Sequence, residues 1–374
     1  MVSRPATVAC LALAALGAST CRLDSETGTG LRITWRVPLT EAAAGWRGRP
    51  GVFQGAVIGQ TGGAVSAFDV RTGARVWTTT LRMGVPLGAD NVAVAAGRAF
   101  AAGGDSVYAL NAASGRRLWA FLPDAQAALC EIAADSDAVY VGTRSHHVYA
   151  ISADSGHAQW SVDVGPDWAF FGTVEGIATS GDTVYVAATQ ELSATGDLRR
   201  GHIIALDRRT GAELWHYTSP GERSDVNAAP LVTGRYLVAN DLYGGSIIAL
   251  DRFEGAEVWR VRTQGIGPSR APQQRDAVLF AGANDNYAYA IDLASGAVRW
   301  TASAGASIRA VALCGERMVA NSQRIEVFAV SSGEHLGTVS TPDDAGLFTS
   351  DFAVVGNRLA IFGSDAVYGL SCPP

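Results

Sequence analysis

An eleven-residue pattern that recurs along the chain restricts the fold more than any other feature of this sequence. Each copy begins with Ala, has Gly at its seventh place and closes on Trp. Six copies are complete, and they are Ala67–Trp77, Ala109–Trp119, Ala150–Trp160, Ala205–Trp215, Ala249–Trp259 and Ala290–Trp300. A shorter seventh copy, Ala329–Gly337, has Gly337 at the closing place. The six Trp residues follow one another at 42, 41, 55, 44 and 41 residues.

A period near forty residues, with four short apolar runs in each period, is typical of the blades of a β-propeller. The runs alternate between apolar and polar residues, as strands do. The Asp or Asn at the third place can accept hydrogen bonds from the turn, and the Gly permits the turn's positive φ. The large Trp side chain can fill the space between two blades. We therefore assign a blade-docking role to Trp35, Trp77, Trp119, Trp160, Trp215, Trp259 and Trp300.

The two ends of the chain predict the number of blades. Leu31–Leu39 reads as a strand, and its Trp35 lies 42 residues before Trp77, in phase with the repeats. The C-terminal stretches "RLAIFG" and "AVYGLS" read as the middle strands of a blade that lacks its outer strand. We predict an all-β fold with eight four-stranded antiparallel blades, in which the N-terminal strand completes the last blade and removes open sheet edges. The alternative is seven blades, with Leu31–Leu39 in a loose tether.

The first thirty residues read as a targeting segment. Arg4 precedes an apolar run that is too short to span a bilayer, so we interpret residues 1–20 as a signal peptide. Cys21 follows "GAST", which resembles a lipoprotein cleavage site, and residues 21–30 form a polar tether ahead of a propeller at 31–374. We expect lipidation of Cys21 and attachment to the outer membrane on the periplasmic side. The alternative is ordinary cleavage, with a free thiol at Cys21 and a secreted protein.

Composition and motifs exclude several kinds of chemistry. The net charge is −6, so nucleic acid is not an expected partner, and the absence of Lys excludes a P-loop or a Schiff-base lysine. No spacing of Cys or His suggests a metal centre; the six His are expected at the surface, with adjacent His146 and His147 pointing to opposite faces of a strand. Blade phase brings Cys314 and Cys372 to one face of neighbouring blades, where they either form a disulfide or remain buried thiols. We expect no catalytic residue, metal or cofactor.

Two segments exceed what the architecture requires. Thr189–Gly201 lengthens one hairpin of the fourth blade and supplies candidate partner-binding residues, namely Leu192, Leu198, Arg199 and Arg200. Long loops on a rigid scaffold often carry binding residues, although a plain solvated loop is the alternative. The connection Gly165–Gly172 brings Trp168, Phe170 and Phe171 together, either to close one end of the central channel or to pack against the ring.

The repeats resemble the PQQ-type propeller repeat over residues 31–374. One branch with such repeats contains quinoprotein dehydrogenases, which use PQQ and Ca²⁺ and have a vicinal cysteine pair and cationic side chains, often Lys, around the quinone. This chain has neither adjacent cysteines nor Lys. It is more similar in length and N-terminus to the BamB-like lipoproteins, eight-bladed rings that bind the barrel-assembly protein of the outer membrane.

The resemblance implies a non-catalytic, membrane-tethered scaffold that binds a protein partner during outer-membrane protein assembly. The alternatives are a PQQ-dependent dehydrogenase and a propeller that senses a ligand in its central funnel. The repeats themselves report the fold rather than the role, because one fold hosts many functions.

Overall fold

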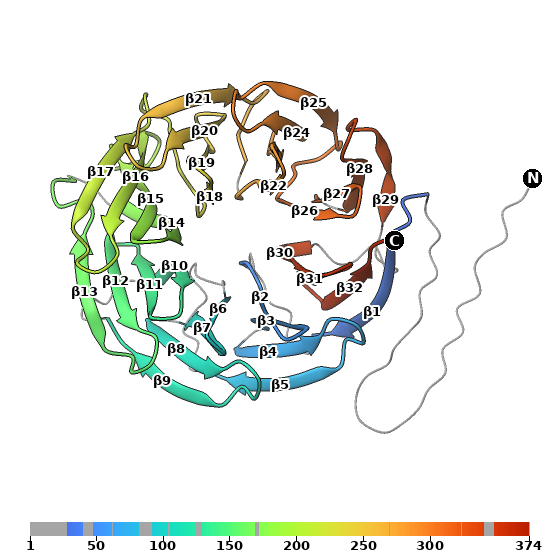
Figure 1. Cartoon of the computed structure of the whole chain (residues 1–374), viewed down its shortest axis with the longest axis horizontal. Coiled ribbons are helices and arrows are strands. Elements are labelled where there is room, and N and C mark those ends of the chain that lie inside the picture. Colours follow the sequence, from blue (N-terminus) through green and yellow to red (C-terminus); the bar gives the residue numbers. More distant parts are fainter. Residues whose placement is uncertain are drawn as a thin grey trace, which may run out of the picture.

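The computed structural model describes residues 28–39, 48–61, 63–81, 92–103, 105–123, 129–168, 172–268, 270–322, 324–339 and 348–373. Every element in these ranges is a β-strand, and the strands form eight four-stranded antiparallel sheets arranged radially as a ring (Figure 1). The predicted eight-bladed β-propeller is therefore confirmed. Nowhere in these ranges is there a helix of the length and apolar character that would span a membrane.

Within each of the first seven blades, the chain runs from the inner strand, nearest the centre of the ring, to the outer strand. The first four blades are β2 (Gly51–Phe53), β3 (Ala56–Gln60), β4 (Ala64–Asp69) and β5 (Arg75–Thr80); β6 (Val92–Ala95), β7 (Arg98–Gly103), β8 (Ser106–Asn111) and β9 (Arg117–Phe121); β10 (Leu129–Ala134), β11 (Ala138–Thr143), β12 (His147–Ser152) and β13 (Ala158–Asp163); and β14 (Gly172–Ser180), β15 (Thr183–Glu191), β16 (Arg199–Asp207) and β17 (Glu213–Thr218). The next three are β18 (Leu231–Thr233), β19 (Tyr236–Asp241), β20 (Ser246–Asp251) and β21 (Glu257–Arg262); β22 (Gln273–Arg275), β23 (Val278–Gly282), β24 (Tyr287–Asp292) and β25 (Val298–Ser303); and β26 (Ala310–Cys314), β27 (Arg317–Asn321), β28 (Ile325–Ala329) and β29 (His335–Val339).

The eighth blade is built from both ends of the chain. It contains β30 (Phe348–Val355), β31 (Arg358–Gly363), β32 (Ala366–Ser371) and, as its outer strand, β1 (Arg32–Pro38). Strand β1 pairs antiparallel with β32, and Trp35 lies opposite Gly369. A Cβ atom on Gly369 would lie only 2.0 Å from the Trp35 ring, so this glycine makes room for the indole. The seven-blade alternative is wrong, because β1 is part of the folded ring.

The tryptophan of the repeat joins each blade to the next one. Trp35, for example, is 1% exposed, and its indole Nε1 donates to the Val70 carbonyl oxygen at 2.9 Å. Its ring also packs over Gly73, where φ is +73° and a Cβ atom would lie 2.7 Å from the ring. The repeat glycine therefore has two roles. It permits the positive φ of its own turn, and it leaves room for the indole of the preceding blade. The same indole-to-carbonyl bond occurs for Trp77 and Ala112, Trp119 and Ala153, Trp160 and Arg208, Trp215 and Arg252, Trp259 and Leu293, and Trp300 and Val330.

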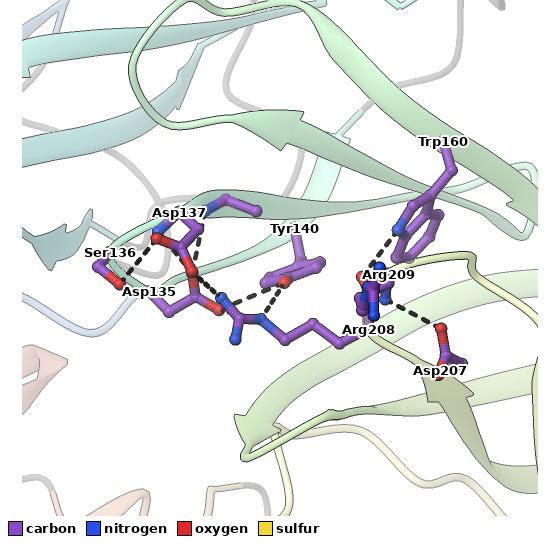
Figure 2. Close-up of polar contacts among 9 residues, drawn as sticks. Asp135, Ser136, Asp137, Tyr140, Trp160, Asp207, Arg208 and Arg209 are labelled. Carbon is purple, nitrogen blue, oxygen red and sulfur yellow. Dashed lines mark hydrogen bonds and ion pairs between the residues drawn. The ribbon is translucent and has the colours of Figure 1, made fainter.

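Polar contacts reinforce the junction between blades 3 and 4 (Figure 2). The Arg208 backbone accepts the Trp160 indole bond at 2.9 Å. The Arg208 side chain reaches back to blade 3, where its Nε donates to the Tyr140 hydroxyl at 3.1 Å and its Nη2 bonds Asp137 at 2.6 Å. Asp135 is also within 3.0 Å of the guanidinium. One residue thus joins the two blades through both its backbone and its side chain.

The junction between blades 7 and 8 lacks the tryptophan. The outer strand of blade 7 has Gly337 at that place, and a Cβ atom there would meet Thr29, which precedes β1. At this junction Cys314 at the end of β26 and Cys372 just after β32 form a disulfide, with their Cα atoms 5.7 Å apart. A covalent bond therefore spans the one blade junction, among those described, at which no indole is available.

Candidate binding face of blades 3 to 5

The strands β15 and β16 of blade 4 form an extended hairpin, which projects from one end of the ring. Strands β15 and β16 pair as far as Glu191 and Arg199, and the Leu192 N–H then bonds the Leu198 carbonyl oxygen at 2.8 Å. At the tip, the Asp197 carboxylate accepts hydrogen bonds from the Ser193 and Thr195 hydroxyls. The hairpin is consequently an ordered projection, and its backbone hydrogen bonds continue to the tip.

Arg199 fastens this hairpin to the connection between blades 4 and 5. Its N–H donates to the Glu222 carbonyl oxygen at 2.9 Å, and its carbonyl oxygen accepts from the Ser224 N–H at 3.1 Å. Its guanidinium bonds the Asp225 carboxylate at 3.2 Å and lies over the Tyr243 ring, 5.6 Å from the centroid. Arg199, one of the four candidate binding residues, is therefore occupied by intramolecular contacts, and these contacts join the hairpin to the connection between blades 4 and 5.

Two buried carboxylates organise the loops beneath the hairpin. Asp241 accepts hydrogen bonds from the Ser219 and Ser224 hydroxyls at 2.9 and 3.0 Å and from the Asp225 N–H at 3.1 Å. Burial raises the pKa of Asp225, with a further rise from the Asp241 charge, against the lowering effects of the Thr189 hydrogen bond and Arg199. A buried charge is costly unless it is bonded in this way, so removing any partner should loosen these loops.

The surface above this framework combines apolar and cationic groups. Tyr243, in the β19–β20 turn, is 52% exposed, and Ile266, in the connection from β21 to β22, is 48% exposed. The two segments are joined by a hydrogen bond from the Gly267 N–H to the Leu242 carbonyl oxygen at 2.7 Å. Leu192, Leu198 and Arg200 are half-buried on the hairpin. Arg200 alternates with Arg199 along β16, so it faces blade 3 with His202, away from Tyr243, and its guanidinium has no ion-pair partner among the described residues. Exposed apolar groups on one side of the hairpin and a cation on its other side are suited to a protein partner.

A cluster of histidines around Trp168 lies next to this hairpin. The Trp168 ring stacks on His202 with centroids 4.9 Å apart and meets the His146 ring edge-on at 5.6 Å. His202 Nδ1 and His216 Nε2 are 2.9 Å apart. Burial lowers the pKa of His202 to about 3, with smaller contributions from His216 and Arg200, so this imidazole is neutral at pH 7.

The structure corrects two expectations about these residues. His202 is 5% exposed and is not a surface histidine. His146 lies in a turn at φ +52°, ahead of strand β12, so the His146 and His147 rings stack side by side at 5.7 Å and do not point to opposite faces. The contact between His202 and His216 could have been predicted from strand register, because the two residues lie diagonally across the paired strands β16 and β17. Trp168 packs with the histidines; Phe170 and Phe171 lie outside the described residues, as does Cys21.

Comparison with known proteins gives one family and several structural relatives. A family model described as "Outer membrane protein assembly factor BamB" matches residues 61–302 and 199–360. The crystal structure of BamB from Moraxella catarrhalis is similar with a TM-score of 0.71 at 17% identity, covering 91% of this chain and 97% of that one. At this identity the likeness shows the fold alone.

Two characterised proteins match parts of the chain. Quinohemoprotein alcohol dehydrogenase ADH-IIG of Pseudomonas putida is 33% identical over 129 residues, which cover 31% of this chain and 17% of the enzyme. Serine/threonine-protein kinase AfsK of Streptomyces coelicolor is 32% identical over 191 residues, 48% of this chain and 21% of the kinase. The chain thus spans about a fifth of the length of either protein, and its similarity to them is confined to a part of each.

Proposed function

Because this chain belongs to the family of the outer membrane protein assembly factor BamB, we propose that it is a non-catalytic scaffold that binds a protein partner during outer-membrane protein assembly. The partner is the barrel-assembly protein of the outer membrane. It binds the face formed by the blade 4 hairpin and the neighbouring turns of blade 5. The family match and the eight-bladed ring support the scaffold role, and the exposed groups of this face support the location.

The observation that carries the proposal is the combination of an ordered framework with unpaired surface groups. Arg199, Asp225 and Asp241 fix the loops from within, so binding costs little ordering of the backbone. Tyr243, Ile266 and the hairpin leucines then offer apolar area, and Arg200 offers a charge. Tyrosine and arginine are among the residue types that dominate measured interface energies.

A quinone-dependent activity is the alternative function, and the residues do not fit it. Ca²⁺ takes six to eight oxygen ligands. Among the described residues, the group of three side chains that could hold a metal ion is His146, His147 and Asp163, which provides two nitrogens and lies at a hairpin of blade 3. The sequence also has no adjacent cysteines. We derive no catalytic step through PQQ.

A ligand-sensing role of the central funnel is the other alternative function, and the described residues form one cavity at which it can be assessed. Inner strands of blades 1, 6, 7 and 8 enclose a cavity of about 220 Å³, which is lined by Arg49, Arg270 and Asp351 among others. Small-molecule sites are usually about 300–1,000 Å³. The Arg270 and Asp351 side chains moreover pair with each other at 3.3 Å. The small volume and the internal ion pair of this cavity favour the blade 4 hairpin and the neighbouring turns of blade 5 as the binding surface.

We also propose that the propeller is tethered to the periplasmic face of the outer membrane. In this proposal residues 1–20 are removed, Cys21 carries the lipid and the spacer ends before Thr29, which is buried at the junction of blades 7 and 8 and accepts a hydrogen bond from Arg317 Nε at 2.6 Å. A Cys21→Ser variant should then move from the detergent-extracted membrane fraction to the soluble periplasmic fraction. Recovery of the wild-type protein in the soluble fraction would contradict the lipid anchor without affecting the proposed partner.

The binding proposal is tested by capture of the barrel-assembly protein from solubilised envelopes of the same organism. The wild-type protein should retain it, and the combined variant Tyr243→Ala, Ile266→Ala and Arg200→Glu should lose it. Phe253→Ala is the matched control, because Phe253 is 65% exposed on blade 5 but lies in the β20–β21 turn at the opposite end of the blade. All variants should keep the wild-type melting curve. Equal capture by the combined variant and the control would overturn the proposed face.

A further inference from the structure

The turn between β11 and β12 brings three metal-ligating side chains together at the end of blade 3. His146 lies in the turn, His147 is the first residue of β12, and Asp163 is the last residue of β13. One ligand atom from each of the three residues lies within 4.8 Å of the others. In a tetrahedral zinc site neighbouring ligand atoms are about 3.3 Å apart, given bond lengths near 2.0–2.1 Å. Metal binding therefore requires side-chain rotations that bring these atoms to that spacing, including a lengthening of the 2.6 Å contact between His146 Nδ1 and Asp163 Oδ1.

The surroundings of each ligand hold it in a usable orientation. The His147 Nδ1 lies 2.7 Å from the Ser145 carbonyl oxygen, so it carries the proton and its Nε2 is free to bind a metal. A carboxylate oxygen of Asp163 accepts the Gly165 N–H at 2.9 Å and meets His146 Nδ1 at 2.6 Å. Imidazoles whose second nitrogen is fixed by a carbonyl, and carboxylates held by backbone donors, are typical of metal sites.

A residue at positive φ in the turn sets the relative orientation of the two histidines. His146 has a φ of +52°, a conformation that residues other than glycine seldom adopt. This conformation stacks the two imidazoles, and the parallel bridge from Ser145 to Gly172 ties the turn to the start of blade 4. Asn286 has the same kind of conformation, at φ +74°, directly before β24 in blade 6, so the positive φ belongs to the hairpin turn, and what distinguishes blade 3 is the pair of histidines that the turn brings together.

We propose that His146, His147 and Asp163 bind one divalent transition-metal ion of the zinc class. Two imidazoles and a carboxylate match the ligand preferences of Zn²⁺, and Cu²⁺, Ni²⁺ and Co²⁺ bind the same donors. The ion takes the place of the direct contact between His146 Nδ1 and Asp163 Oδ1. Water completes the coordination, and the Trp168 ring covers one side of the site. The ion joins the hairpin of blade 3 to the segment that leads into blade 4.

The test is a titration of the full-length mature protein, purified through a tag without histidine and stripped of metal with EDTA. Titration with ZnCl₂ should show one ion bound per chain by calorimetry. The variants His147→Ala and Asp163→Asn should each weaken binding by at least about tenfold. His157→Ala is the matched control, since His157 is an exposed residue of the same blade in the β12–β13 turn, and it should bind like wild type.

A second measurement keeps the proposal open to refutation if a variant fails to fold. In the wild-type protein, paramagnetic Co²⁺ should broaden the ring-proton resonances of His146 and His147 at one equivalent and leave those of His157 and His335 sharp. Cu²⁺ should also quench wild-type tryptophan fluorescence more than it quenches that of Trp168→Phe. Uniform broadening of all histidines, or zinc binding unchanged in His147→Ala, would overturn the site.

Discussion

Replacing Trp35 by alanine tests how the ring is closed. Trp35 is 1% exposed, and it lies with Phe68, Phe362 and Val367 in the cluster between blades 8 and 1. Losing a buried large aromatic side chain costs about 3–5 kcal/mol. The Val70 carbonyl oxygen also loses its indole donor, which adds about 1 kcal/mol if water does not replace the bond. We therefore expect a loss of about 4–6 kcal/mol from a free energy of unfolding that is typically about 5–15 kcal/mol.

The assay is urea denaturation of the wild type, Trp35→Ala and Trp35→Phe, followed by circular dichroism. Trp35→Phe keeps most of the buried ring and loses only the indole hydrogen bond, so it should cost about 1–2 kcal/mol. Deleting residues 31–38 should be worse than Trp35→Ala and should promote self-association, because it exposes the edge of β32. Curves for Trp35→Ala and wild type that agree within about 0.5 kcal/mol, as surface substitutions do, would refute the closure.

Three further perturbations should have measurable effects on stability. Gly369→Ala places a methyl group in the space that the Trp35 indole occupies, so it should lower the melting temperature strongly. Gly63→Ala is the control, because its added Cβ atom would meet nothing within 4 Å. Similar melting curves for the two variants would contradict the packing of Trp35 on Gly369. Reducing the Cys314–Cys372 bond, which spans 58 residues, should cost about 4 kcal/mol in the chain-entropy model, and calorimetry with and without dithiothreitol measures this cost. Because His202 has a pKa of about 3 when folded and 6.5 as its reference value, its contribution to stability is complete above pH 6.5 and is lost progressively as pH falls toward 3. The decline in stability between pH 6.5 and 5 should therefore be shallower in His202→Phe, and parallel profiles would count against the buried neutral imidazole.

The blades and the ring closure could be predicted because they depend on spacing along the chain. The repeat fixes where each strand pairs with its neighbour, and the phase of Trp35 placed β1 at the outer edge of the last blade. The sequence did not reveal what the repeat glycine contacts. Gly73 faces the indole of the blade before it, and that contact joins residues of different copies.

The candidate face was only partly predictable for a related reason. The length of the blade 4 hairpin is visible in the sequence, so Leu192 and Leu198 could be placed on it. The ion pair of Arg199 with Asp225 joins the hairpin to a connection that has no repeat pattern, and no spacing rule indicates it. The stacked pair His146 and His147 depends on one residue at positive φ, which the strand alternation of the sequence conceals.

Building the eighth blade from both chain ends sets an order for synthesis and folding. The Thr34 hydroxyl bonds the Gly369 carbonyl oxygen across 335 residues, so β1 cannot find its partner until β32 has emerged. Contacts between such distant residues slow folding, and until then both edges of the unfinished blade are open to other chains. A chain that stops short of Ala366 never leaves that state. The pairing of β1 with β32 therefore makes burial of these edges depend on synthesis through β32, because a chain without that strand keeps them open to other chains.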